Sequence, residues 1–430
     1  NRGEQLEKHE ILKAQLMKVF DGDIVKEIIF SKIWEACSYM GNYIWNNFKK
    51  EDAIQLFEGK TTACFSFENL VDKLSPPKHL NVIDTENKNN NIFSKDILSE
   101  IIQNHKIPIN FSQEEQETTD KYRSVINFPT LLLYVFYIKS PEKNSSFDDK
   151  KLLDVFKNFN KTEEFILELL KVRIYYDKYI VKNDLSNEND SKWGIRSFEI
   201  SSNEIKTKET TFEDSGYEDK IEMLQSMFYY STISNNKKEW LLELLENKPE
   251  ADNEIYVTLL RNFKSNISNL DLYGLNYPEI PTKIFYYFEY MLWEIYFDYV
   301  KPQKCIEEKL ENIKVKIKSK EKVFNKYKFK QLNSKEHLLS QNKFYTFREQ
   351  LNLSEEDLNS FANLCLISTS ENSAASNDNH YEKKSRFENS ETSLKRLMMF
   401  EAFHGNLWNK DCMKNHLQDM FHLLKYYQDK

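Results

Sequence analysis

The sequence NSKEHLLSQ occupies residues 333–341, FANLCLI follows at residues 361–367, and Asn372 lies five residues beyond. Within this stretch Glu336 directly precedes His337. Histidine is the side chain best suited to activate water near neutral pH. Carboxylate and amide oxygens suit Mg²⁺, and a further oxygen can orient an imidazole ring. The segment therefore has the residue types of a metal-assisted hydrolytic site.

The C-terminal region around this segment differs in pattern from the rest of the chain. Leu364 to Ser368 predicts a short strand, and residues 370–380 predict a polar loop. Helices are predicted over Ser393 to Phe403 and in the last segment, where apolar residues share one helical face. Residues 315–329 interleave apolar residues with lysines and fit either short strands or a helix. Together these patterns predict a small α+β unit.

The preceding 300 residues predict helices almost throughout. Apolar residues recur at helical spacing over residues 4–58, 122–137, 152–181 and in shorter segments between 221 and 300. The polar segments 76–97 and 183–218 predict surface loops, and no segment before residue 300 alternates as a strand does. The predicted fold class is mainly α, with helical N-terminal and middle regions before the small α+β domain.

Composition excludes several classes of protein. Only 8 of the 430 residues are glycine, and neither a P-loop nor a Rossmann glycine motif occurs in the chain. The longest apolar run, Leu131 to Ile138, is far shorter than the roughly 20 residues of a membrane-spanning helix. The 5 cysteines are scattered, which argues against a disulfide framework and against a cysteine-based zinc site. We expect a cytoplasmic protein with no membrane partner.

Charge is unevenly distributed along the chain. The net charge is −8, yet residues 301–348 contain 14 Lys and Arg against 5 Glu. Such a segment can be an electrostatic footprint for phosphate. It can equally be a solvated, lysine-rich helical face, and both interpretations remain open.

The other histidines offer no comparable pattern. None of them has Cys, Asp or His partners at metal-ligand spacing. We interpret six of them as surface or packing residues and one as ambiguous: His9, His79, His105, His404, His416 and His422, and His380 in the predicted loop.

The order of an acidic residue, a histidine and two asparagines nine residues apart is that of HNH (ββα-metal) nucleases. The C-terminal 100 residues resemble the HNH-type domain of GmrSD-like proteins, which are modification-dependent restriction factors of bacteria. The family elements E-H-x-x-P-Q and G-N-L-x-L correspond to residues 336–341 and 362–366. Its N-S element with a following lysine pair corresponds to residues 372–373 and 383–384.

This resemblance implies a role for each matched residue. His337 would be the general base, and Asn363 would fix the His337 ring or the loop that bears it. The remaining roles are metal binding by Glu336 and Asn372, with Mg²⁺ or Mn²⁺ as the ion, and DNA binding by Lys383 or Lys384. Two positions depart from the family pattern: Ser340 stands where the family has proline, and Ala362 where it has glycine.

Upstream segments resemble the same family. Residues 1–6, NRGEQL, are similar to an element late in its ParB/sulfiredoxin-like nucleotide-binding domain, which implies nucleotide binding by Asn1, Arg2 and Gly3. Residues 127–129 and 173–182 look like its helical middle. The family's D-G-Q-Q-R element would lie before Asn1, so we expect a preceding N-terminal portion, with a nucleoside triphosphate bound by the intact protein.

These observations predict three domains and one main function. The domains are a remnant of the nucleotide-binding domain (1–60), a helical middle region (61–300) and an HNH-like nuclease domain (301–430). The function is Mg²⁺-dependent hydrolysis of DNA in phage defence, with modified phage DNA as a candidate substrate. Two alternatives stay open: an inactive HNH-like domain that binds DNA or protein, and an RNA-directed nuclease. Assembly into a homo-oligomer also stays open.

Overall fold

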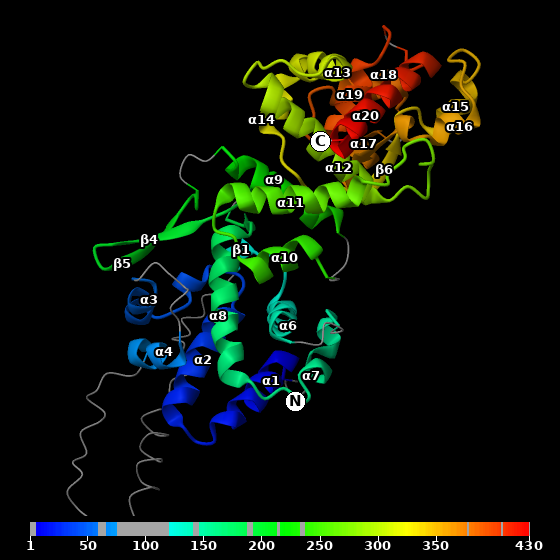
Figure 1. Cartoon of the computed structure of the whole chain (residues 1–430). Coiled ribbons are helices and arrows are strands. Elements are labelled where there is room, and N and C mark those ends of the chain that lie inside the picture. Colours follow the sequence, from blue (N-terminus) through cyan, green and yellow to red (C-terminus); the bar gives the residue numbers. More distant parts are fainter. Residues whose placement is uncertain are drawn as a thin grey trace, which may run out of the picture. The chain divides into compact units, whose positions relative to one another are not determined.

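The computed structural model describes residues 6–58, 66–74, 120–140, 146–186, 192–212, 216–232, 237–375, 378–405 and 407–429. The chain divides into two compact units, Asn1–Thr211 and Phe212–Lys430, each taken by itself below (Figure 1). The predicted mainly α fold class with small β elements is confirmed. No helix in the described ranges is long and apolar enough to cross a membrane.

The first unit is built around helix α8, whose strong apolar pattern the sequence predicts. Nearly every apolar side chain of α8 is buried, and the helix packs against α2 and α6. Asp23 caps α2 and Asn127 caps α6, each accepting a hydrogen bond from the main chain three residues on. The helices are α1 (Lys8–Met17), η1 (Lys18–Phe20), α2 (Ile24–Ser38), η2 (Ile44–Asn46), α3 (Lys50–Phe57), α4 (Phe67–Leu74), α6 (Phe128–Lys139), η5 (Asp149–Lys151), α7 (Leu152–Val155) and α8 (Thr162–Tyr179).

The expectation of no strand before residue 300 is wrong. The strands β1 (Tyr122–Arg123), β2 (Lys182–Asp184) and β3 (Lys192–Gly194) form an antiparallel sheet, and β4 (Ser197–Ser201) and β5 (Glu204–Lys208) form a hairpin. The last four lie in the segment predicted to be a surface loop. The strands are short, the buried side chains of β2 are polar, and β4 and β5 have no buried residue, so the apolar alternation that marks a strand is weak.

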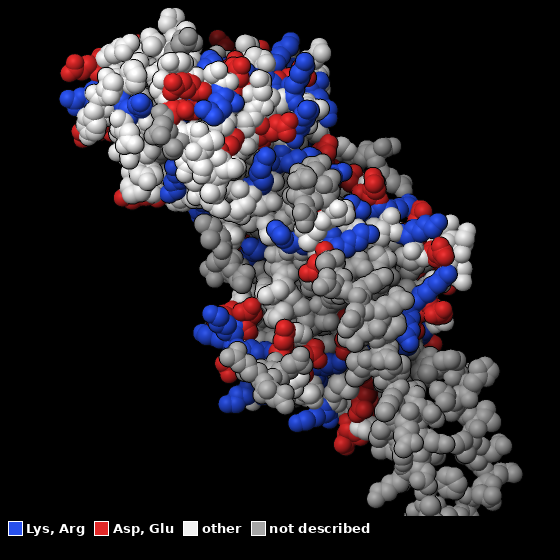
Figure 2. Space-filling view, turned by 180° about the vertical axis from the view of Figure 1, so that it is seen from behind, with Lys and Arg blue, Asp and Glu red and all other residues white. Residues whose placement is uncertain are grey.

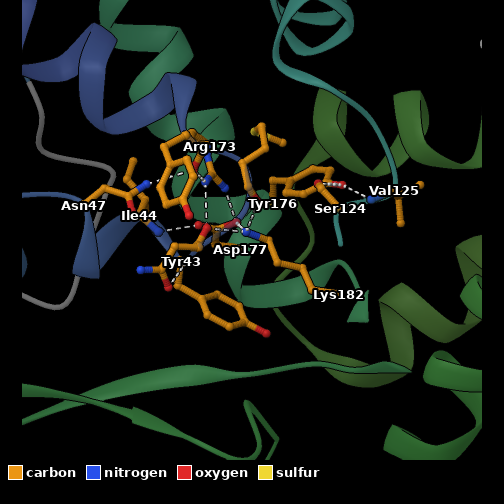
Figure 3. Close-up of polar contacts among 12 residues, drawn as sticks. Tyr43, Ile44, Asn47, Ser124, Val125, Arg173, Tyr176, Asp177 and Lys182 are labelled. Atoms are coloured by element: carbon orange, nitrogen blue, oxygen red, sulfur yellow. Dashed lines mark hydrogen bonds and ion pairs between the residues drawn. The ribbon is translucent and has the colours of Figure 1, made fainter. Parts of the chain in front are cut away.

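A buried ion cluster joins the end of α8 to the loop after α2 (Figure 3). Asp177 pairs with both Arg173 and Lys182, and its Oδ2 accepts a hydrogen bond from the main-chain N–H of Ile44. Arg173 donates to main-chain carbonyls of the loop, including that of Asn42 at 3.0 Å, and Lys182 donates to the same carbonyl at 2.6 Å. The cluster thereby fixes residues 37–44 against α8.

The second unit is built around α12 (Thr282–Ile295), in which every residue from Ile284 onward is buried. The other elements are α9 (Glu218–Ser231), α10 (Glu239–Asn247), α11 (Asp252–Ile267), the π-helix η6 (Tyr296–Val300), α13 (Glu308–Ser319), α14 (Glu321–Lys326), β6 (Ser334–His337), α15 (Gln341–Phe347), α16 (Glu355–Asn359), η7 (Phe361–Asn363), β7 (Leu364–Ile367), α17 (Thr369–Ala375), α18 (His380–Phe387), α19 (Leu394–Glu401) and α20 (Lys410–Asp429).

Two buried charged residues link α12 to the strand β7. Glu289 of α12 accepts hydrogen bonds from Ser393 Oγ (2.6 Å) and the Lys395 N–H (3.3 Å), and so caps the N-terminus of α19. Burial raises the pKa of Glu289 to about 7. Lys395 in turn donates to the main-chain oxygens of Phe361 and Leu364, at the start of η7 and of β7. These contacts hold β7 in a fixed position on the unit's core.

Candidate active site

The three segments singled out in the sequence meet in a ββα arrangement. Strands β6 and β7 pair antiparallel, with His337 opposite Leu364, and helix α17 follows β7 directly. The predicted strand at residues 364–368 is confirmed. The predicted loop at 370–380 is wrong, because α17 covers residues 369–375; its many small polar side chains weaken the helical pattern in the sequence. Residues 315–329, left open between strand and helix, lie largely in α13 and α14.

His337 is the last residue of β6 and is 7% exposed. Its Nε2 lies 3.2 Å from Asn359 Oδ1, and its ring stacks edge-on against Tyr277 at 4.8 Å between centroids. Burial lowers the pKa of His337, and the hydrogen bond to Asn359 and the negative charge of Glu336 oppose that shift. The imidazole is therefore neutral at pH 7, the state that can accept a proton.

Asn359 and Tyr277 are residues that the sequence interpretation missed. The main-chain oxygen of Asn359 also accepts a hydrogen bond from the Tyr277 N–H at 2.9 Å. Asn359 therefore contacts the His337 ring through its side chain and holds Tyr277, the other neighbour of the ring, through its main chain. Asparagine is abundant throughout this chain, and Asn359 matches no family element. In the sequence, only its position four residues before Asn363 connects Asn359 with the candidate site.

Asn363 is fully buried and supports the segment that follows His337. Its Oδ1 accepts hydrogen bonds from the Leu339 N–H and the Trp408 indole, both at 3.0 Å. Its Nδ2 donates to the main-chain oxygens of Leu339 and Leu358. All the hydrogen-bonding capacity of the side-chain amide is thus used to hold the segment after β6 to α16 and to Trp408, rather than to contact the His337 ring.

Glu336 pairs with Lys383 beside His337. The Lys383 Nζ donates to Glu336 Oε1 and, at 2.7 Å, to the main-chain oxygen of His337. Lys383 is 3% exposed, whereas the Glu336 side chain retains 20% exposure. The carboxylate is therefore partly open to solvent on the same strand as the histidine.

The other predicted site residues are placed differently. Asn372 lies on α17, where its Nδ2 is 3.4 Å from Ser334 Oγ at the opposite end of β6 from His337. Lys384 donates to the main-chain oxygen of Phe400 at 2.9 Å and lies over the ring of Phe403. Asn1, Arg2 and Gly3 lie outside the described residues. The metal, DNA and nucleotide roles of these residues stay predictions.

The backbone accommodates both departures from the family pattern. Ser340 has φ −65° and ψ 150°, the conformation that proline adopts, and it precedes α15 as its N-cap residue. Ala362 lies in η7 and is not among the residues with positive φ, so it does not require glycine. Neither substitution distorts the segment that carries Glu336 and His337.

The available oxygens suit a hard cation. Among the described residues no group of three or more His, Cys, Asp and Glu side chains could hold a metal ion, so the arrangement differs from that of a structural zinc site. A carboxylate, a main-chain carbonyl and an amide fit Mg²⁺, which commonly keeps several waters and uses substrate phosphate as a further ligand. Glu336 and the carbonyl of His337 offer two of these oxygens side by side, as their shared contact with Lys383 shows, whereas Asn372 contacts Ser334 at the other end of β6.

The basic segment 301–348 is partly neutralised by folding. Lys316, Lys320 and Lys326 each lie within 4 Å of an acidic side chain from beyond the segment: Asp419 at 2.6 Å, Glu401 at 3.6 Å and Glu391 at 3.9 Å. Figure 2 shows basic and acidic side chains mixed over the described part of one face. The segment is therefore less distinctive as a phosphate footprint than its sequence suggests.

Comparison with known protein families agrees with this geometry. Residues 285–423 match the family model for the C-terminal domain of GmrSD restriction endonucleases. The C-terminal part of the chain is thus related to the GmrSD restriction endonucleases. The match includes the whole ββα arrangement, Asn359 and Lys383. No curated protein and no solved structure matches the chain.

Proposed function

We propose that the GmrSD-type C-terminal region cleaves DNA by metal-dependent phosphodiester hydrolysis, with His337 as the general base. The observation that carries the proposal is the buried imidazole of His337 at the end of a strand in the ββα arrangement, next to the partly exposed carboxylate of Glu336. Modified phage DNA is the substrate that the predicted role in phage defence favours.

In the proposed reaction, His337 accepts a proton and Glu336 stabilises the charge that forms. When Asn359 Oδ1 accepts a hydrogen bond from Nε2, the lone pair of His337 lies on Nδ1, which can take a proton from water. The water oxygen then bonds to phosphorus as the bond from phosphorus to the leaving oxygen breaks. The negative charge of Glu336 favours the imidazolium that forms.

Glu336 and Asn372 are the residues that would hold Mg²⁺, and Asn363 keeps the strand that carries the base in place. When bound, the ion supplies positive charge for the scissile phosphate and the leaving oxygen. A nucleotide bound by the intact protein would regulate cleavage, as the upstream resemblance suggests.

The test is cleavage of plasmid DNA and of glucosylated phage DNA by the purified chain, with Mg²⁺ or with EDTA. We expect Mg²⁺-dependent cleavage that falls by about 10²–10⁴-fold in His337→Ala, because the general base is removed. His404→Ala is the matched control, since His404 is an exposed histidine of the same unit, and it should cleave as the wild type does.

Two results would contradict the proposal. Cleavage that persists in His337→Ala would place the base elsewhere. Retained DNA binding without cleavage of either substrate would favour the alternative of an inactive HNH-like binding module.

A further inference from the structure

The contacts of Lys383 resemble those of a cation in an oxygen site. Its ammonium group lies between the carboxylate of Glu336 and the main-chain oxygen of His337, which it contacts at 2.7 Å. Both partners are hard oxygens of the kind that bind Mg²⁺ and Mn²⁺. One of them, Glu336, is the residue that the proposed function assigns to the metal.

Helix α18 holds Lys383 firmly in this position. Asn379 and Glu382 form a reciprocal capping box at the start of the helix: Asn379 Oδ1 accepts from the Glu382 N–H at 3.0 Å, and the Glu382 carboxylate accepts from the Asn379 N–H at 2.7 Å. The Lys383 side chain is almost fully buried, so its charge is poorly screened by water. A divalent ion that approaches the Glu336 carboxylate therefore meets a fixed, like-charged group.

We infer that Lys383 is the resident cation of the metal-free site and that it competes with the divalent ion for Glu336. This inference rests on the proposed function. In this role Lys383 is a positioning residue: it holds the carboxylate and the end of β6 in place until the metal binds. Displacement by the ion would release the Lys383 ammonium group toward phosphate, which is the role that the sequence suggested for it.

Lys384 provides a matched control on the same helix. Its Nζ donates to the Phe400 main-chain oxygen and lies 4.7 Å from the centroid of the Phe403 ring. Replacing it removes the same charge from the neighbouring position without touching Glu336. A difference between variants of Lys383 and Lys384 therefore reports on the contact with the carboxylate.

The first experiment measures Mn²⁺ binding to the full chain without DNA, by the electron paramagnetic resonance signal of free Mn²⁺. We expect Lys383→Met to bind Mn²⁺ about tenfold more tightly than the wild type, because a nearby positive charge is removed. Lys384→Met should stay within about twofold of the wild type, and Glu336→Gln should abolish the gain in the Lys383→Met background. An unchanged or weakened affinity in Lys383→Met overturns the inference.

A second measurement uses the wild-type chain and does not depend on how Lys383→Met folds. The chain is treated with a water-soluble acetylating reagent with and without Mn²⁺, and mass spectrometry measures the extent of acetylation at each lysine. The reactivity of Lys383 should rise when Mn²⁺ is bound, while that of Lys384 stays constant; equal reactivity of Lys383 in both states contradicts displacement.

The outcomes also separate this inference from the proposed function. If the wild type cleaves DNA but binds Mn²⁺ no more weakly than Lys383→Met does, the proposed nuclease function stands. The inference that Lys383 competes with the metal ion is then wrong. Failure of both proteins to bind Mn²⁺ without DNA overturns this inference, whereas absence of metal-dependent DNA cleavage overturns the proposed function.

Discussion

In each unit a buried lysine ammonium group pairs with a carboxylate, at Asp177 in the first unit and at Glu336 in the second, and the two clusters differ in how completely the carboxylate is enclosed. In the first unit Asp177 is fully buried, and it is engaged by Arg173, by Lys182 and by the Ile44 N–H (Figure 3). In the second unit Glu336 keeps part of its side chain exposed, and its ion pair with Lys383 engages one oxygen, Oε1.

This difference separates a structural clamp from a candidate reaction site. Arg173 and Lys182 also donate hydrogen bonds to main-chain carbonyls of residues 37–42, at the end of α2 and in the loop after it. The whole cluster therefore fixes that segment. Burial lowers the pKa of Lys182 to about 7, and the charge of Asp177 opposes the shift. Glu336 instead adjoins a histidine, and part of its side chain is exposed to solvent. A buried ion pair alone does not indicate function; an accessible carboxylate beside a base does.

The largest effect on stability is expected from opening the closed cluster. Asp177→Ala leaves the buried Arg173 and Lys182 side chains without their carboxylate and should lower the free energy of unfolding of the first unit by about 3–5 kcal/mol. Urea unfolding followed by circular dichroism, with hydrogen exchange to assign the loss to the first unit, measures it. Glu204→Ala removes the exposed partner of Lys50 and should cost less than about 1 kcal/mol. Equal costs for both variants would show that the enclosure of Asp177 has no energetic consequence.

A smaller loss of stability is expected from the support of the candidate site. Asn363→Ala leaves the Leu339 N–H and the Trp408 indole without their acceptor in a buried position, and should lower the free energy of unfolding by about 2–3 kcal/mol. The same urea titration measures this change. Asn266→Ala, at an exposed position of the second unit, should stay within about 0.5 kcal/mol of the wild type. A loss of cleavage in Asn363→Ala at unchanged stability would instead indicate direct catalysis by Asn363.

The smallest effect is expected on the pH dependence of the open site. The hydrogen bond that His337 Nε2 donates to Asn359 Oδ1 raises the pKa of His337, so Asn359→Leu should lower that pKa further. Because the base acts when neutral, cleavage rises with pH through this pKa, and the acid limb of the pH–rate profile should move to lower pH. Single-turnover cleavage across pH 5 to 8 measures the shift. Asn253→Leu, at an exposed position on the helix α11 of the same unit, serves as the control. An acid limb that does not move in Asn359→Leu would show that Asn359 does not affect the base.

The family match and the helical content could be predicted because they depend on local order in the sequence. Helical spacing over residues 152–181 anticipated α8, and the pattern over residues 364–368 anticipated the strand β7. The hairpin of β4 and β5 was missed because its exposed, polar strands carry little alternation. Its few apolar side chains pack on distant residues, such as Phe198 against Trp45.

By itself, the sequence determined the types of residue at the site, their order along the chain and the helices that surround them, because these depend on side-chain chemistry and local periodicity. Only the tertiary structure decided that Asn359 and not Asn363 contacts the His337 ring, and that Lys383 holds Glu336. It also decided that acidic side chains from beyond the basic segment pair with several of its lysines. These contacts join residues far apart in the chain, and packing selects among many chemically identical asparagines and lysines that the sequence alone cannot tell apart.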